Sequence, residues 1–491
     1  MTPFSLYSTA ILVIILFFSC KNEVQEQIDS GGYPEEIAKI VKTNCAVPGC
    51  HNNISKEAAS GLSMETWENL FEGTRNGAAV IPFKPGFSTM FLFTNVYPDL
   101  GPSASPTMPA GMPPLSKNDV TTLKNWIANG APNYQGHIKF SDNPNRKKVY
   151  VTNQGCDQVA VVDANSGIVM RLIDVGVTPG PGESPHMVKV SPDGQFWYVI
   201  FLSSQYMQKY STSDDQHVSN IFIGAGFWNT FVITSDGKKA FVCDFSTQGN
   251  VAYVDLENEQ LKANYGGLGF NSPHGLAISN DNNYLYVARQ IGNHLYKLNV
   301  SDPMDPEVET VQLQPGQFPG PLPAYNPHEI IFIPDGTKYF VSCQGTNEVR
   351  IYNATNDSLI DVLQIGEFPQ EMAVSTTTDY LFVTNMEDKS GTVTRPPNGK
   401  GSVAIINYKT NVVVSHVYSG YEPHGVAVDE ENKYVFIANR NTKSEGPAPH
   451  HSTECVGRNG YLTIIDLSTM LMKPGYKHEL TVDPYSVAVR P

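Results

Sequence analysis

The stretch His274-Gly275-Leu276-Ala277-Ile278-Ser279, followed by Tyr286-Val287-Ala288-Arg289, is one copy of a pattern that recurs through most of the chain. Each half is rich in apolar residues, and turn-forming Asn and Asp residues lie between the halves. Short runs of this kind, bounded by turn residues, predict β-strands. Six further copies of the second strand lie at residues 149–153, 198–201, 241–244, 340–343, 382–385 and 436–439. The pattern therefore predicts a protein made mostly of β-strands.

The copies recur at intervals of roughly 42 to 54 residues with about four short strands each, which is typical of a β-propeller. Seven copies predict seven blades. The first repeat lacks an innermost strand, and the chain ends on an unpartnered strand, Ser486-Val487-Ala488-Val489-Arg490. We expect this last strand to complete the first blade, which leaves the ring without a free edge. Residues 142–491 resemble the YVTN-repeat propellers of bacterial envelope proteins.

The composition is that of a folded, acidic protein. Of the 491 residues, 41% are hydrophobic and only 16% are charged, and the formal net charge is −15. Because no basic cluster is present, we expect no nucleic-acid partner. The seven cysteines are an odd number, so at least one lies outside any intramolecular disulfide.

The N-terminus has the features of an export signal. Residues 10–18 (AILVIILFF) form an apolar run that is too short to span a bilayer and suits a signal peptide. The following Ser19-Cys20 resembles the cleavage site of bacterial lipoproteins. The resemblance implies a signal peptide over residues 1–19, a membrane-anchoring lipid on Cys20 and a tether over residues 20–32. An ordinary signal peptide or an uncleaved anchor is the alternative, and each places the mature protein in the bacterial cell envelope, periplasmic or at the outer membrane.

Two cysteines directly before a histidine form the densest chemical motif of the chain. Four residues separate Cys45 from Cys50, and His51 follows at once. In a c-type haem site two thiols attach the haem, and the neighbouring histidine ligates its iron. The alternative is a Cys45–Cys50 disulfide that closes a Pro-Gly turn.

The residues around this motif favour the haem site. We expect helices with apolar faces to start near Pro34, Ser63 and Ser116, and a loop with two Met-Pro pairs precedes the last of them. A thioether on such a loop is a suitable second ligand for haem iron.

This order of elements resembles a small bacterial c-type cytochrome domain over residues 33–135. The resemblance implies a small all-α cytochrome c domain that precedes the propeller and carries one covalent haem c. The implied site residues are Cys45 and Cys50 as thioether attachments, His51 as one iron ligand, and Met108, with Met112 as the alternative, as the other.

A second candidate site lies where the innermost strand of each predicted blade begins. Because blade strands alternate in direction, these positions should surround the mouth of the central channel. Their residues are His186, Asn229, His274, His328, Gln370, His424 and Tyr485. An insertion over residues 441–459 that contains His450 and His451 should reach the same face. Four cysteines, as disulfides, buried thiols or ligands, map near it: Cys156, Cys243, Cys343 and Cys455.

Two interpretations of the histidines stand side by side. In one, Pro-His is simply how this repeat starts a strand, and the imidazoles hydrogen-bond between blades. In the other, the imidazoles bind a second transition metal. That site would use His186, His274, His328, His424, His450 and His451. Nitrous-oxide reductases and propeller nitrite reductases offer analogies, but only at the level of the fold.

These features predict an extracytoplasmic haem c electron-transfer protein with a redox protein partner and a propeller that serves as docking or scaffold domain. The first alternative is a redox metalloenzyme, an oxidoreductase whose histidine-lined propeller site receives electrons from the haem. The second alternative is a surface binding module without haem. Whether the chain is an enzyme is left open by its sequence.

Overall fold

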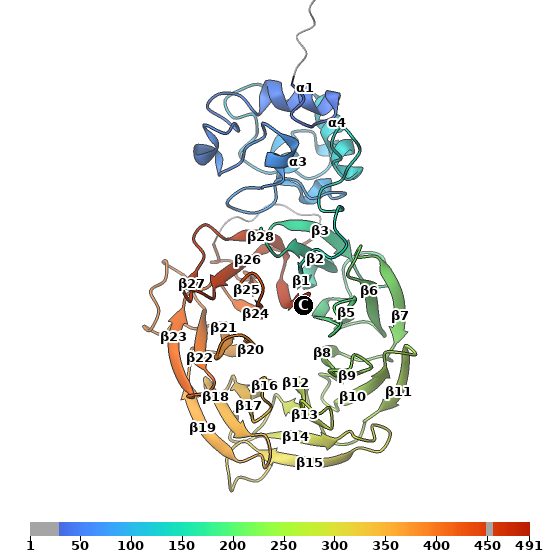
Figure 1. Ribbon diagram of the computed structural model, residues 1–491, viewed down its shortest axis with the longest axis vertical. Helices are drawn as coiled ribbons and strands as arrows, with labels where there is room; N and C mark the ends of the chain where they lie inside the picture. Colours follow the sequence, from blue (N-terminus) through green and yellow to red (C-terminus); the bar gives the residue numbers. More distant parts are fainter. Residues whose placement is uncertain (1–28, 448–454) are drawn as a thin grey trace, which may run out of the picture.

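The computed structural model describes residues 29–447 and 455–491 (Figure 1). The expected signal peptide, Cys20, most of the expected tether, His450 and His451 lie outside these residues. Within the two described ranges, no helix is long and apolar enough to cross a membrane.

The N-terminal region, residues 29–147, consists of short helices joined by irregular segments (Figure 1). The first and last of its α-helices were expected, and Ser116 caps the last by accepting a hydrogen bond from the Asp119 N–H at 3.1 Å. The helices are α1 (Glu35–Asn44), η1 (Lys56–Ala59), α2 (Trp67–Leu70), η2 (Pro85–Phe87), α3 (Thr89–Thr94), η3 (Pro98–Leu100) and α4 (Lys117–Ala128).

The helix expected to start at Ser63 is wrong in its extent. Only α2 is helical here, and the Thr66 hydroxyl caps it by accepting from the Asn69 N–H at 3.1 Å. The chain before it is extended, because the Met64 N–H donates to the His51 carbonyl at 2.8 Å instead of joining a helix. Helix α3 was not expected from the sequence.

The rest of the chain is a ring of seven antiparallel sheets, which confirms the predicted seven-bladed propeller. Each blade has four strands, and the last blade has a fifth. The first three blades contain β1 (Lys148–Asn153), β2 (Gln158–Asp163) and β3 (Val169–Asp174); β4 (Pro185–Val190), β5 (Phe196–Phe201), β6 (Tyr206–Ser211) and β7 (His217–Phe222); and β8 (Trp228–Ile233), β9 (Lys239–Asp244), β10 (Asn250–Asp255) and β11 (Gln260–Asn264), with η4 (Gln154–Cys156) between β1 and β2.

The other four blades complete the ring. They contain β12 (Pro273–Ile278), β13 (Tyr284–Arg289), β14 (His294–Asn299) and β15 (Glu307–Gln312); β16 (Pro327–Phe332), β17 (Lys338–Cys343), β18 (Glu348–Asn353) and β19 (Leu359–Gln364); β20 (Pro369–Val374), β21 (Tyr380–Asn385), β22 (Ser402–Asn407) and β23 (Val412–Val417); and β24 (Pro423–Asp429), β25 (Tyr434–Asn439), β26 (Asn459–Asp466), β27 (Leu471–Met472) and β28 (His478–Val482).

The two ends of the propeller chain meet in its first blade, as predicted. The last strand, β29 (Pro484–Val489), pairs antiparallel with β1, and Val487 lies opposite Val151. The Arg490 N–H extends this pairing by donating to the Lys148 carbonyl at 2.9 Å. The first blade is therefore built from both ends of the propeller, which removes a free sheet edge.

The N-terminal region is not a separate all-α domain as expected, because part of its core is shared with the propeller. Ile81 and Phe87 belong to the same buried cluster as Val169 and Leu172 of β3. The contact surface is thus a continuous apolar core between the short helices and the first and last blades.

Candidate functional site

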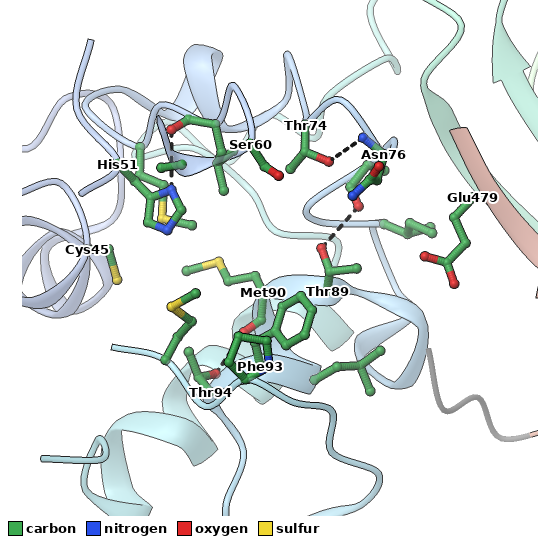
Figure 2. Close-up of a pocket in the computed structure, with 18 of the residues that line it drawn as sticks. Cys45, His51, Ser60, Thr74, Asn76, Thr89, Met90, Phe93, Thr94 and Glu479 are labelled. Carbon is green, nitrogen blue, oxygen red and sulfur yellow. Dashed lines mark hydrogen bonds between the residues drawn. The ribbon is translucent and has the colours of Figure 1, made fainter. Parts of the chain in front are cut away.

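A cavity of about 460 Å³ lies beside the cysteine–histidine motif (Figure 2). Its wall contains Cys45, Cys50, His51 and Met108, which are four of the five residues predicted for the haem site. Met112 does not line it and is 46% exposed. A mostly apolar pocket of this size with a few polar groups is typical of a small-molecule or cofactor site.

His51 is oriented by a backbone carbonyl. Its Nδ1 lies 3.3 Å from the Leu62 carbonyl oxygen, which can only accept a hydrogen bond, so Nδ1 carries the hydrogen and Nε2 keeps its lone pair. Figure 2 shows the second ring nitrogen pointing into the cavity, towards Met90. Burial lowers the pKa of His51, and the Leu62 carbonyl acts in the opposite direction. The side chain therefore presents a ring nitrogen with a free lone pair to the cavity.

Cys45 and Cys50 are free thiols, so the alternative Cys45–Cys50 disulfide is not formed. The turn between them is closed by hydrogen bonds from the Cys50 N–H to the Val47 carbonyl at 3.0 Å and from the His51 N–H to the Cys45 carbonyl at 3.1 Å. Both cysteines line the cavity, and burial raises the pKa of Cys45 to about 12. The folded turn therefore presents two thiols and one imidazole to the same space.

Three methionines, Met64, Met90 and Met108, contribute thioethers to the wall. Met108 is held by its N–H, which donates to the Phe93 carbonyl at 2.8 Å. Met64 lies in the segment that was expected to be a helix starting near Ser63, and no role was expected for Met90. No local signal distinguishes a buried methionine that faces a cavity from one that fills a core.

The propeller closes the far side of this cavity. Val169 and Leu172 of β3 and Leu480 of β28 add apolar wall, and Asn459 and Glu479 add polar groups. Asn459 Nδ2 donates to Glu479 Oε1 at 2.7 Å. In Figure 2 Glu479 lies at the end of the cavity away from Cys45 and His51. The cavity thus has a sulfur-rich end in the N-terminal region and a polar end that includes the propeller.

Four of the predicted propeller histidines come together on the ring axis with Tyr485. We call His186, His274, His328, His424 and Tyr485 the histidine circle. Neighbouring ring centroids are 6.3 Å apart for His186–His274, 3.9 Å for His274–His328, 5.9 Å for His328–His424, 3.7 Å for His424–Tyr485 and 4.1 Å for Tyr485–His186. Asn229 and Gln370 occupy the two wider gaps in blade order.

The histidine circle is buried and does not form an open mouth. Its members are between 1% and 8% exposed. Burial, with the neighbouring imidazoles, lowers the pKa of His186 and His328 well below the ordinary value and that of His274 to about 3. Among the described residues, no group of three or more His, Cys, Asp or Glu side chains is already arranged to hold a metal ion.

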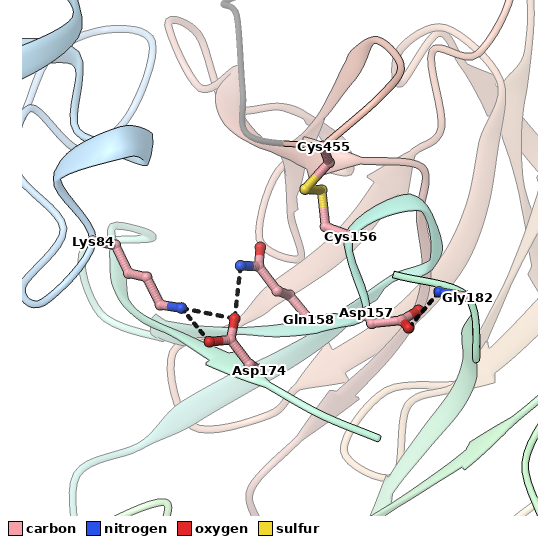
Figure 3. Close-up of a disulfide and its surroundings, with 7 residues drawn as sticks. All are labelled: Lys84, Cys156, Asp157, Gln158, Asp174, Gly182 and Cys455. Atoms are coloured by element: carbon pink, nitrogen blue, oxygen red, sulfur yellow. Dashed lines mark hydrogen bonds and ion pairs between the residues drawn. A yellow bond between two sulfur atoms is a disulfide. The ribbon is translucent and has the colours of Figure 1, made fainter. Parts of the chain in front are cut away.

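The four cysteines of the propeller form one disulfide and two free thiols. Cys156 and Cys455 form a disulfide across 299 positions of sequence, with Cα atoms 5.3 Å apart (Figure 3). Cys243 and Cys343 are buried free thiols. The Cys243 thiol donates to the His274 carbonyl at 2.9 Å, and burial raises its pKa to about 12. The disulfide therefore ties the insertion before β26 to the first blade.

Comparisons with known proteins concern the propeller. A family model described as "Lactonase, 7-bladed beta-propeller" matches residues 229–365. No curated protein matches the chain. The chain is similar to the periplasmic gluconolactonase of Pseudomonas aeruginosa, with 15% identity over 70% of this chain and 99% of that chain and a TM-score of 0.52. It is also similar to a 6-phosphogluconolactonase candidate from Bacteroides uniformis, with 12% identity over 70% and 100% of the two chains and a TM-score of 0.51. At these identities the likeness shows the fold alone.

Proposed function

We propose that the chain is a c-type haem protein that transfers single electrons, with the propeller as its docking and scaffold part. The observation that carries this proposal is the convergence of Cys45, Cys50 and His51 on one apolar cavity whose wall also holds thioethers. Thiol, imidazole and thioether are the donor set of covalently attached, His/Met-ligated haem. The residues present therefore fit the group.

Each of these residues has a distinct task in the proposal. Cys45 and Cys50 hold the haem covalently, and His51 supplies Nε2 to iron because Leu62 fixes its tautomer. Met108 supplies the second ligand, as a soft donor that favours reduced iron. When bound, the haem supplies one-electron oxidation and reduction.

The wall of the cavity is apolar where the N-terminal region meets the propeller. Ile81, Phe87 and Leu172 line the cavity and belong to the apolar core that the N-terminal region shares with the propeller. In this proposal a redox protein partner exchanges electrons with the haem, and a lipid on Cys20 keeps the chain at the membrane of the cell envelope.

The test is covalent haem retention. The full chain is exported together with a haem-attachment system, and haem is measured by its visible spectrum and by staining after denaturing electrophoresis. We expect the wild type to keep haem through denaturation and the Cys45→Ser/Cys50→Ser variant to lose it. Met112→Ala is the matched control, because Met112 does not line the cavity.

The comparisons suggest one competing function, lactone hydrolysis, since the family model and the similar structures are named for lactonases. A wild type that takes up no haem and hydrolyses gluconolactone would contradict the proposal and favour the hydrolase. A wild type that keeps haem and leaves the lactone intact supports the proposal.

A further inference from the structure

Haem has a polar edge that the function proposed above leaves without a partner. The two vinyl groups that react with cysteines lie on one half of the porphyrin, and its two propionate carboxylates lie on the other half. In Figure 2 Cys45 and His51 lie at one end of the cavity, and Asn76 and Glu479 lie towards the opposite end. A haem held by Cys45 and Cys50 therefore directs its propionates to the end that includes the propeller.

The N-terminal region and the propeller are joined at this polar end. The Glu479 N–H of β28 donates to the Asn76 carbonyl at 2.8 Å. Gly77 allows the close approach, because its φ is +114° and a Cβ there would lie 3.2 Å from the Glu479 nitrogen. Asn459 Nδ2 of β26 donates to Glu479 Oε1 at 2.7 Å. Two propeller strands and the segment around Asn76 therefore build this end of the cavity together.

Two polar atoms of the propeller wall are buried and lack a partner among the described residues. Thr481 and Asn459 both line the cavity and are 4% and 5% exposed. Thr481 Oγ1 and Asn459 Oδ1 make no hydrogen bond. An unpaired buried polar atom costs about 1–3 kcal/mol, so a ligand that completes these hydrogen bonds is favoured.

The rest of the described wall has no such unpaired atoms, since buried side-chain nitrogen or oxygen atoms without a partner occur in it only at Asn459 and Thr481. Asn44 Nδ2 donates to the Ile40 carbonyl at 2.9 Å, within α1. Thr94 Oγ1 donates to the Met90 carbonyl at 2.8 Å, within α3. The unused hydrogen-bonding capacity of the wall is therefore concentrated on the propeller.

These two side chains have the chemistry that a carboxylate needs. The Thr481 hydroxyl can donate a hydrogen bond, and the Asn459 amide carries a second hydrogen besides the one that it donates to Glu479. A hydrogen bond to a charged acceptor contributes about 1.5–3 kcal/mol, more than one between neutral groups. Glu479 itself would repel an ionised propionate, but it interacts electrostatically with Lys477, which offsets its charge.

We propose that the propeller binds the propionate edge of the haem through hydrogen bonds from Thr481 and Asn459. This inference rests on the proposed haem function and adds that the propeller is a part of the haem site, beyond its docking and scaffold role. A propionate that accepts these bonds exerts less of its negative charge on the iron, so the two donors raise the reduction potential.

The test uses the full chain loaded with covalent haem. Thr481→Val removes the hydroxyl with little change of shape, Thr481→Ser keeps it, and Asn459→Ala removes the amide. The matched control is Thr378→Val, because Thr378 Oγ1 is also buried without a partner but does not line the cavity. The two readouts are the propionate bending band in the resonance Raman spectrum and the reduction potential from potentiometric titration.

Thr481→Val and Asn459→Ala should each shift the propionate band to lower wavenumber, because hydrogen bonding to the carboxylate raises this frequency. Both should also lower the reduction potential. Thr481→Ser and Thr378→Val should match the wild type in both readouts. Covalent haem content should be the same in all four variants, because none of them changes Cys45 or Cys50.

An unchanged band and potential in both Thr481→Val and Asn459→Ala, with haem still attached, would overturn the propionate site and leave the proposed haem function intact. A wild type without covalent haem would overturn both. If neither variant folds, hydrogen exchange decides. Residues 478–482 should exchange at least 10-fold more slowly in the haem-loaded wild type than in the Cys45→Ser/Cys50→Ser variant, and equal exchange would overturn the site.

Discussion

Lys84 of the N-terminal region and Asp174 at the end of β3 form an ion pair, with 2.6 Å between Nζ and Oδ2 (Figure 3). The Asp174 side chain is 70% exposed, and Gln158 Nε2 also donates to it at 3.0 Å. Solvent screens a pair of this kind, so its contribution to stability is about 0–1 kcal/mol. The attachment of the N-terminal region therefore depends mainly on the apolar core beside the pair.

The first prediction compares the two kinds of contact. Phe87→Ala removes a ring that is buried in the core shared with the propeller, and we expect a loss of about 3–5 kcal/mol in the free energy of unfolding. Lys84→Ala should cost at most about 1 kcal/mol. Urea unfolding measures both. Equal losses in the two variants would contradict the dominance of the apolar core.

The second prediction concerns the sulfur ligand of the proposed haem. Met108→Ala should lower the reduction potential and change the visible spectrum, because loss of a thioether ligand removes a donor that favours reduced iron. Potentiometric titration of the haem-loaded chain measures the change. Met112→Ala should leave both properties as they are. If Met90→Ala or Met64→Ala reproduces the change and Met108→Ala does not, the assignment of Met108 is wrong.

The third prediction concerns the propeller residue at the polar end of the cavity. A carboxylate near the haem stabilises the oxidised, more positive form, so Glu479→Gln should raise the reduction potential at neutral pH. The comparison variant is Glu431→Gln, a change of the same charge on the propeller at a position that does not line the cavity. An unchanged potential in Glu479→Gln would show that the propeller wall does not influence the haem.

The fourth prediction concerns the Cys156–Cys455 disulfide. Replacing both cysteines by serine should lower the free energy of unfolding by about 2–4 kcal/mol, because the unfolded chain loses a cross-link across 299 positions. A thiol reductant should destabilise the wild type and leave the variant unaffected. A wild type that is insensitive to complete reduction would contradict a stabilising role for this bond.

The fifth prediction concerns pH. Burial, with the charge of Arg289, lowers the pKa of His294 to about 4, whereas an unfolded histidine titrates near 6.5. The unfolded chain therefore binds this proton first, and stability is lost as the pH falls from about 6.5 to 4. The free energy of unfolding should therefore depend less steeply on pH in His294→Gln, by up to about 1.4 kcal/mol per pH unit. Denaturant unfolding at pH 8 and pH 5 tests this. If the wild type and His294→Gln lose the same free energy of unfolding between the two pH values, the prediction is wrong.

The sequence by itself determined the propeller, because the residues that specify each strand lie close to one another in the chain. Alternating apolar residues and turn residues within about ten positions specify each strand, and seven copies specify the ring, including the last strand of the chain in the first blade. The same local pattern indicated α1, α4 and the Cys45–His51 motif. It failed at Ser63, where a backbone hydrogen bond between His51 and Met64 holds the chain extended.

Only the tertiary structure decided which distant residues meet. Sequence left the partner of Cys156 open, and in the folded chain Cys455 is its partner. It placed the histidines at a channel mouth, whereas the packing of seven blades buries them in a closed circle. No role was expected for Glu479 from the sequence, although this residue of β28 lines the same cavity as His51, at its opposite end. Strand formation depends on neighbours along the chain, but burial and cavity lining depend on how separate blades and helices pack, which no short stretch of sequence specifies.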